Sequence, residues 1–361
     1  MRKRTKKWMV GLTLAAVGAF LLQQSISCIG STRAPCIVCV QGTSLSPKEE
    51  TLLKQHRPVG VMLMPPNCES EEQVKELTKQ IHHSKCLVAA DIERLINKLR
   101  RFYSLNENPA DLRNTSPSEV YAHHFKIASY VKSLGIDIIF CPLTDVSCEG
   151  SCMTEHAFSD DPEHAALCAT AAVKAYQDSG VAPVIKHLPG HGKAADFHDK
   201  LPIIDCAKEV LEACNLKTSQ RVIEILRAEN RRLPAAMTAH VKYLALDPEA
   251  PATFSATIFD MLRKHIGLGD SVVFSDSLNV RAVQDFCKGK NTNLHPFLVA
   301  YKKFQQAGGD IAVFGATTHE GGMVQICGTI EELAHIPRLF TNKNSKIFLR
   351  LKAMGIIIPK G

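Results

Sequence analysis

Residues 181–192 are "VAPVIKHLPGHG", a short apolar run that ends in Lys186 and His187 and continues into a segment of proline and glycine. The apolar part is continuously hydrophobic rather than alternating, which is typical of a parallel strand buried on both faces. Pro189 and Gly190 disfavour regular structure directly after it. The stretch therefore predicts a buried strand that closes on polar residues and opens into a loop.

Seven other runs of this kind recur along the chain, separated by amphipathic or polar stretches. Two of these stretches, residues 70–83 and 162–180, predict helices, and the second opens with Asp-Asp-Pro and closes with Gly180, as helix ends do. Strand and helix repeated eight times predict an α/β fold, a single-domain (β/α)8 TIM barrel with its active site at the carboxyl ends of the strands. An open, doubly wound sheet is the alternative, although no glycine-rich phosphate fingerprint follows the first run. The eight runs are "CIVCVQ" (36–41), "VGVMLM" (59–64), "CLVAAD" (86–91), "IDIIFCPL" (136–143), "VAPVIKH" (181–187), "PAAMTAH" (234–240), "SVVFSD" (271–276) and "DIAVFG" (310–315).

Polar side chains stand at the ends of five of these runs. In a barrel of parallel strands the carboxyl ends meet at one face, where catalytic groups collect, so we expect these side chains to lie close together. Any one of them alone is equally well explained as an ordinary strand terminator. They are Asp91, Asp145, Lys186 with His187, His240, and Ser275 with Asp276.

The end of the fifth run and the loop after it, residues 186–202, contain three histidines, which raises the question of a metal site. His187 and His191 have the i, i+4 spacing of zinc ligands on a helix, but the proline and glycines around them disfavour that helix. A loop could still gather metal ligands, so a metal site stays a minor alternative and no metal is expected. A phosphate cradle is disfavoured because no helix N-terminus follows at once.

The same loop carries Asp196 and His198, two residues apart. A carboxylate beside a histidine favours the imidazolium and fixes its orientation, which suits a group that transfers protons near neutral pH. A buried carboxylate across the barrel mouth would complete such a site, and Asp276 is the candidate. A solvated Asp and His without a role is the alternative for this loop taken alone.

The net charge of +7 is concentrated at the N-terminus. Subtracting five basic residues found before position 8 leaves 7 − 5 = +2, so the rest of the chain gives no electrostatic reason to expect a nucleic-acid partner. These residues are Arg2, Lys3, Arg4, Lys6 and Lys7.

An apolar run, residues 8–22, and the polar "QQSISC" that ends at Cys28 follow this basic cluster, as in an export signal. We therefore divide the chain into an N-terminal signal or anchor segment, residues 1–28, and a catalytic domain, residues 29–361. The protein is expected to be exported and periplasmic, or held at the membrane by this segment alone. Cleavage, lipid attachment at Cys28 and a retained anchor stay open, and a buried N-terminal helix in a cytoplasmic protein is the alternative.

The chain has 13 cysteines, an odd number, so at least one is unpaired within it. Cys36 and Cys39 form a CxxC, and Cys148 and Cys152 a CxxxC, but neither has a second pair at zinc-ribbon spacing. Several of the cysteines lie in apolar runs, where a buried thiol behaves as a small hydrophobic side chain. Structural thiols are therefore expected in preference to disulfides or a metal.

The loop "KHLPGHGKAADFHDKLP" (186–202) and the run "VVFSDSLNV" (272–280) together resemble glycoside hydrolase family 3, specifically the single-domain NagZ-type beta-N-acetylglucosaminidases. The resemblance covers about residues 36–340. It also includes "IDIIFCPLTDV" (136–146), "MTAHVKYLALDPEAPATFS" (237–255) and "AGGDI" (307–311).

The resemblance implies a retaining beta-glycosidase that acts by double displacement. Asp276 matches the family nucleophile, His198 the acid/base, and Asp196 the carboxylate that orients it. Lys186 and His187 match a pair that holds the substrate. Asp91 matches a carboxylate that accepts hydrogen bonds from sugar hydroxyls; no cofactor is implied.

Parts of the binding pocket depart from the family pattern. Phe197 stands where the family has serine between the dyad residues, and Ser277 replaces an acidic residue after the nucleophile. Residues 91–99, "DIERLINKL", lack the paired glycines of the family, and Arg94 or Lys98 could serve as the sugar-binding base. His156 falls where the family has an arginine, so a titrating cation replaces a permanent one.

These features lead to two hypotheses of different class. The first is an exo-acting beta-N-acetylglucosaminidase, a monomer whose partner is a muropeptide or N-acetylglucosaminide substrate such as GlcNAc-anhydroMurNAc with or without its peptide. The second is a noncatalytic muropeptide-binding relative, supported only by the pocket changes. The first is favoured because a binding protein has no need of the nucleophile and both dyad residues.

Overall fold

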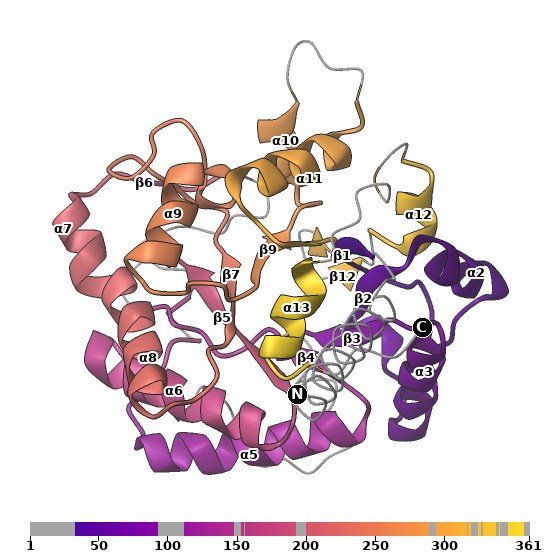
Figure 1. Ribbon diagram of the computed structural model, residues 1–361, viewed down its shortest axis with the longest axis horizontal. Helices are drawn as coiled ribbons and strands as arrows, with labels where there is room; N and C mark the ends of the chain where they lie inside the picture. Colours follow the sequence, from indigo (N-terminus) through magenta and orange to yellow (C-terminus); the bar gives the residue numbers. More distant parts are fainter. Residues whose placement is uncertain are drawn as a thin grey trace, which may run out of the picture.

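The chain folds into a closed barrel of eight parallel strands surrounded by helices (Figure 1). This computed structural model describes residues 33–92, 112–147, 153–154, 156–192, 200–288, 294–315, 317–318, 324–325, 328–336, 339 and 346–356. Around the barrel the strand order is β1-β10-β9-β7-β5-β4-β3-β2. The strands are β1 (Ala34–Val38), β2 (Pro58–Leu63), β3 (Leu87–Ala90), β4 (Ile138–Ile139), β5 (Ala182–Leu188), β7 (Ala235–Thr238), β9 (Val273–Ser277) and β10 (Ile311–Val313).

Each of the eight predicted runs overlaps one barrel strand, so the predicted TIM barrel is confirmed and the open sheet is wrong. The barrel closes because β1 pairs in parallel with both β2 and β10, for example Cys36 with Ala312. Two small sheets lie outside the barrel and were not predicted. They are β6 (Ile203–Ile204) with β8 (Lys242–Tyr243), and β11 (Thr317–Thr318) with β12 (Val324–Gln325).

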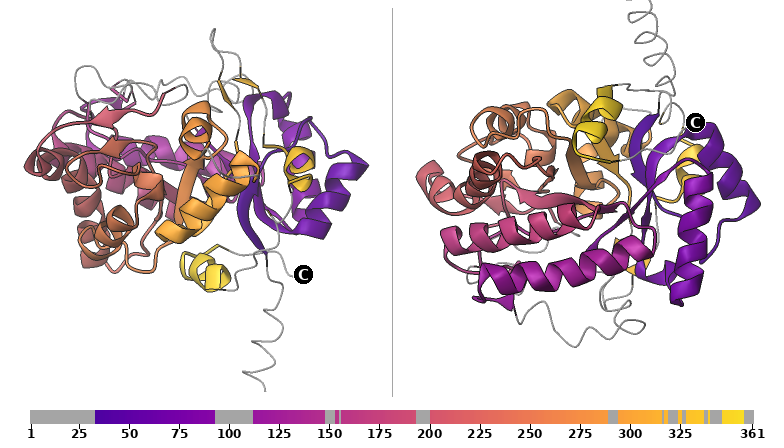
Figure 2. Two further views of the ribbon diagram at one scale, coloured as in Figure 1. Left: turned by 90° about the horizontal axis from the view of Figure 1, so that it is seen from above. Right: turned by 60° about the horizontal axis from the view of Figure 1, so that its bottom comes forward.

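Helices connect the strands and cover the outside of the barrel, and Figure 2 shows α5 and α6 side by side along one flank. The two predicted helices are confirmed as α3 and α6. The helices are α2 (Pro47–His56), α3 (Glu71–His83), α5 (Pro117–Ser133), α6 (Pro162–Asp178), α7 (Lys208–Leu211), α8 (Lys217–Ala228), α9 (Ala256–Lys264), α10 (Arg281–Cys287), α11 (Pro296–Ala307), α12 (Ile330–Ala334) and α13 (Lys346–Ala353), with 3-10 turns η1 (Pro65–Asn67) and η4 (Ala252–Phe254) and the π-turn η3 (Glu212–Leu216).

The helix starts follow from local side-chain chemistry. Ser116, before α5, accepts the N–H of Glu119, and the Glu119 carboxylate accepts the N–H of Ser116, which is a capping box. Asp161 likewise accepts two N–H groups at the start of α6, where Pro162 occupies the first turn. These caps fix where each helix leaves the loop at the carboxyl end of the preceding strand.

Two layers of apolar side chains explain why the strands are hydrophobic on both faces. Along β1, Cys36 and Val38 face the helices, whereas Ile37 and Cys39 face the barrel interior. The interior is filled by residues such as Ile138, Val184, Met237, Phe274 and Val313. Ile347 and Leu351 of α13 join this interior layer, and Figure 1 shows α13 lying across one end of the strands.

Nine of the cysteines lie in the described part of the chain. Seven of these nine are buried, as expected for structural thiols; Cys148 and Cys152 lie outside the described residues. Within the described ranges, no helix combines the length and hydropathy needed to cross a membrane. The predicted segment 1–28 lies outside these ranges, so the domain division stays a prediction.

Candidate active site

The barrel places the predicted strand-end residues around one mouth. Asp276 belongs to β9, Lys186 and His187 to β5, and Asp91 follows β3 directly. The Nζ atom of Lys186 lies 3.1 Å from both carboxylate oxygens of Asp91. His187 Nε2 lies 3.7 Å from Asp276 Oδ2, so side chains of β5 contact both the carboxylate that follows β3 and the carboxylate of β9.

Asp276 is nearly buried, with 16% of its side chain exposed. Burial alone would raise the pKa of its carboxyl, but the charges of His240 and His187, the N–H of Ser277 and the charge of Lys186 together hold that pKa well below its usual range. The Ser277 N–H donates to Oδ1 at 2.6 Å. The carboxylate is therefore ionised near neutral pH, as an attacking carboxylate must be.

The ion pair of Lys186 and Asp91 forms one wall of the mouth. The Lys186 side chain is 2% exposed, whereas the Asp91 side chain is 20% exposed. A buried ammonium held by a carboxylate is a fixed hydrogen-bond donor, and Asp91 is the more exposed acceptor of the pair. The roles predicted for Lys186 and Asp91 in binding sugar hydroxyls stay predictions.

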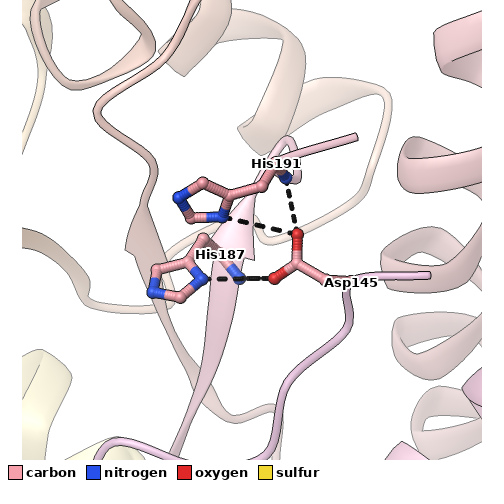
Figure 3. Close-up of side chains that lie close together, drawn as sticks. All are labelled: Asp145, His187 and His191. Carbon is pink, nitrogen blue, oxygen red and sulfur yellow. Dashed lines mark hydrogen bonds and ion pairs between the residues drawn. The ribbon is translucent and has the colours of Figure 1, made fainter. Parts of the chain in front are cut away.

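Asp145, His187 and His191 form a second, deeper group (Figure 3). The backbone N–H of His187 donates to Asp145 Oδ2 at 3.1 Å, and Nδ1 of the same residue lies 3.2 Å from that oxygen. The His191 N–H donates to Asp145 Oδ1 at 2.5 Å. Burial opposes the charge of Asp145, but bonds from both histidines outweigh it and lower the pKa of the carboxyl, while burial lowers the pKa of His191.

This group is also where the described residues could hold a metal ion. Its three ligand atoms lie within 4.8 Å of one another, and all three side chains are buried. Both oxygens of Asp145 already accept hydrogen bonds from the two histidines. A metal would have to replace the bond from the His187 ring, so the geometry fits a hydrogen-bonded cluster without requiring an ion.

His240, at the end of the sixth predicted run, contacts the backbone of Ser277, the residue that follows the candidate nucleophile. Its Nε2–H donates to the carbonyl oxygen of Ser277 at 3.0 Å, and its Nδ1 lies 2.8 Å from the Thr253 hydroxyl. Burial lowers the pKa of His240, and the nearby charge of Asp276 opposes that shift. The sequence marked His240 as a strand-end residue, but this role next to Asp276 was missed because it depends on the pairing of β7 with β9.

The first residues of the predicted catalytic loop are described, and the dyad is not. Gly190 and Gly192 have φ values of 117° and 51°, which favour glycine. The Tyr243 hydroxyl donates to the Gly190 carbonyl oxygen and connects β8 to this turn. Asp196 and His198, with Phe197, Arg94 and Lys98, lie outside the described residues.

His156 is described and exposed, on the segment that precedes α6. Its backbone N–H donates to the carbonyl oxygen of Met153 at 3.0 Å. No described hydrogen bond or ion pair connects its side chain to Asp276, Lys186 or His187, so its sugar-binding role stays a prediction.

Comparison with known proteins agrees with this geometry. Residues 37–333 match the model of the Glycosyl hydrolase family 3 N terminal domain. A beta-hexosaminidase from Alkalilimnicola ehrlichii is 34% identical over 265 residues, which are 70% of this chain and 74% of that protein. A second beta-hexosaminidase, from Shewanella frigidimarina, is 29% identical over 66% of this chain and 72% of its own.

Solved structures share the fold. The family 3 beta-N-acetylglucosaminidase from Paenibacillus sp. is 26% identical with a TM-score of 0.66, covering 80% of this chain and 54% of its own, so this chain spans about half of that protein. NagZ from Neisseria gonorrhoeae, in complex with N-trifluoroacetyl-D-glucosamine, has a TM-score of 0.67 at 24% identity, with 90% of each chain covered. The chain therefore belongs to glycoside hydrolase family 3, among its beta-hexosaminidases.

Proposed function

We propose that the protein is a retaining exo-beta-N-acetylglucosaminidase. The observation that carries this proposal is Asp276, a carboxylate at the barrel mouth that its neighbours keep ionised and that has 16% of its side chain exposed. Such a carboxylate can attack an anomeric carbon and form a glycosyl-enzyme, the first step of double displacement.

The proposed reaction uses two further pairs of residues, whose roles come from the resemblance to the family. His198, oriented by Asp196, protonates the leaving glycosidic oxygen and then removes a proton from the water that breaks the glycosyl-enzyme. Lys186 and Asp91 hold sugar hydroxyls at fixed positions while positive charge develops on the ring. The reaction so written needs no cofactor, and the configuration at the anomeric carbon is retained.

The proposed substrates are N-acetylglucosaminides from peptidoglycan, GlcNAc-anhydroMurNAc and its peptides. The N-trifluoroacetyl-D-glucosamine bound to the Neisseria relative supports a pocket for an N-acylated glucosamine. The basic and apolar character of residues 1–28 supports export, so we propose that the enzyme acts outside the cytoplasm on wall fragments.

Hydrolysis of a chromogenic beta-N-acetylglucosaminide by the full chain tests the proposal. Asp276→Ala is expected to abolish turnover and His198→Ala to reduce it strongly, whereas Asp270→Asn is expected to leave it unchanged. Asp270 is the matched control because its side chain is 96% exposed and pairs with Arg350. A folded wild type that binds muropeptides without turning them over would instead be the noncatalytic relative.

The stereochemical course provides a second test. Proton NMR of the first product should show the beta anomer before it equilibrates, because two displacements restore the starting configuration. The alpha anomer as first product would require direct attack by water and would remove Asp276 from the role of nucleophile.

A further inference from the structure

Asp145 is a buried carboxylate for which the proposed reaction has no direct use. Only 1% of its side chain is exposed, and it lies on the segment that follows β4, behind the residues that line the mouth. Its oxygens accept the backbone N–H groups of His187 and His191 and face Nδ1 of His187. A charge buried at this depth costs free energy unless it is paired, so its bonds to the two histidines must offset that cost.

The contacts of Asp145 set the orientation of the His187 ring. Because the carboxylate faces Nδ1, the proton on that nitrogen is held there, and Nε2 points the other way. The His191 ring packs edge-on against His187, with centroids 4.3 Å apart and planes at 89°. The ring is therefore fixed from behind and from one side, and Nε2 lies 3.7 Å from Asp276 Oδ2.

We propose that Asp145 is a positioning residue that aims His187 at the nucleophile, so that His187 acts on Asp276 and not only on the sugar. The inference rests on the proposed double displacement. In its second step the bond between an Asp276 oxygen and the anomeric carbon breaks and its electron pair returns to the carboxylate. Water supplies the new oxygen, and its proton passes to His198.

The ring donates from Nε2 only when both of its nitrogens carry protons; in that form the Nδ1–H donates to Asp145, and the Nε2–H stabilises the negative charge as it returns to Asp276. The effect of Asp145 should thus be largest on breakdown of the glycosyl-enzyme. The same carboxylate also fixes the backbone at His191, ahead of Asp196 in the sequence. Asp145 would then position both the His187 ring next to the nucleophile and the backbone at His191.

Asp145→Asn is the informative substitution because it keeps the size of the side chain and one acceptor oxygen. The amide has only one acceptor oxygen, so it cannot accept from His187 on one side and from the His191 N–H on the other, and it removes the negative charge opposite the His187 ring. Residues that orient a functional imidazole commonly matter by about 10- to 100-fold, and we expect kcat on the chromogenic substrate to fall by about that factor. KM should fall with it, and the released aglycone should show a burst approaching one per enzyme, because the glycosyl-enzyme accumulates.

A double-mutant cycle with His187→Gln separates positioning from general support of the fold. If Asp145 acts through His187, Asp145→Asn should cost little further activity once His187 is replaced. Additive losses would overturn the inference. The inference would also be overturned if Asp145→Asn lowered the burst amplitude but left kcat per active site unchanged, because that result would show only a loss of folded enzyme.

Thr144→Val is the matched control for stability. The Thr144 hydroxyl accepts from Ser219 at 2.9 Å and contacts the Lys186 carbonyl oxygen, so its loss also disturbs the end of β4, without touching the ring of His187. We expect it to lower the melting temperature without changing kcat per folded molecule. An equal loss of kcat in this variant would contradict a specific role for Asp145.

Nitrogen NMR of the histidine rings tests the inference without turnover. With His187→Gln to assign the signal, the His187 ring should carry protons on both nitrogens in the wild type and lose one of them in Asp145→Asn. An unchanged His187 signal would overturn the inference even in an active enzyme. If the His187 signal changes as expected but the wild type has no glycosidase activity, the result would count against the proposed function and not against the positioning role of Asp145.

Discussion

Asp276 and Asp310 are both largely buried aspartates at strand ends, but they lie at opposite ends of the barrel. Asp310 precedes β10 and is 6% exposed; one oxygen accepts from Val273 N–H and Arg263 Nη2, each at 2.9 Å, and the other pairs with Arg350. Asp276 closes β9 at the mouth, next to two histidines and the ammonium of Lys186.

The two environments suit different purposes. Arginine is always charged and donates in a rigid planar geometry. Two arginines and a backbone N–H therefore occupy both oxygens of Asp310, which indicates a structural role in holding neighbouring segments together. Histidine and lysine around Asp276 supply charge while leaving part of the carboxylate exposed at the mouth. Incomplete pairing with the protein therefore distinguishes the reactive aspartate from the structural one.

Asp276→Asn should give the largest difference in activity between the two aspartates. We expect kcat/KM on a chromogenic beta-N-acetylglucosaminide to fall by about 10³-fold or more, as when other covalent nucleophiles are removed. The corresponding Asp310→Asn should retain kcat/KM within about twofold per folded molecule, because Asp310 is at the far end of the barrel from the mouth. Comparable activity losses in both variants would break the distinction.

Asp310→Asn should instead act on stability. Its carboxylate accepts charge-assisted bonds from Arg263 and Arg350, so we expect the free energy of unfolding to fall by about 2–3 kcal/mol. Urea unfolding followed by circular dichroism measures this. A loss below about 0.5 kcal/mol would mean that water satisfies the two guanidinium groups equally well.

The free energies of unfolding of wild type and Asp276→Asn should differ by an amount that depends on pH. The pKa of Asp276 is lower in the folded chain than its unfolded value of about 3.9, so its charge stabilises the fold above about pH 4, and this contribution is lost as pH falls through the folded pKa. Asp276→Asn should therefore be less stable than wild type at pH 7, by about 1–2 kcal/mol, with a gap that narrows below pH 4.

Unfolding measured at pH 7, 5 and 3.5 in parallel for both proteins tests this sign. A gap that widens on acidification would mean that the mouth raises the pKa of Asp276, and that its surroundings favour the neutral acid rather than the nucleophile.

Much of the fold and of the site could be predicted from the sequence, for physical reasons. Strands buried on both faces have continuous apolar runs, so all eight could be recognised, and parallel closure brings their polar ends together. Asp91, Lys186, His187 and Asp276 were found in this way. The parts that were not predicted depend on contacts between loops, such as Asp145 with His191, His240 with the Ser277 carbonyl, and Tyr243 with Gly190.

These missed contacts share a cause. Hydrogen bonds to backbone N–H and carbonyl groups leave no residue-type signal in the partner, so a single sequence shows only the side chain that makes them. Asp145 could be identified as a strand-end carboxylate, but not as the acceptor of two N–H groups. The small sheets β6–β8 and β11–β12 were missed because two-residue strands carry too short a hydrophobic pattern.

Arg263 and Arg350, which both pair with Asp310, should contribute unequally to the free energy of unfolding. Arg263 also donates to the carbonyl oxygens of Gly269, Ser271 and Gly308, whereas Arg350 on α13 adds only a bond to the exposed Asp270. Arg350→Met should therefore cost about 0.5–1 kcal/mol, and Arg263→Met more, because the loss of Arg263 leaves three carbonyl groups and a buried carboxylate short of a donor. Urea unfolding of both variants beside wild type would show the difference. The reverse order would mean that α13, through Arg350, contributes more to holding Asp310 than the connection between α9 and β9 does.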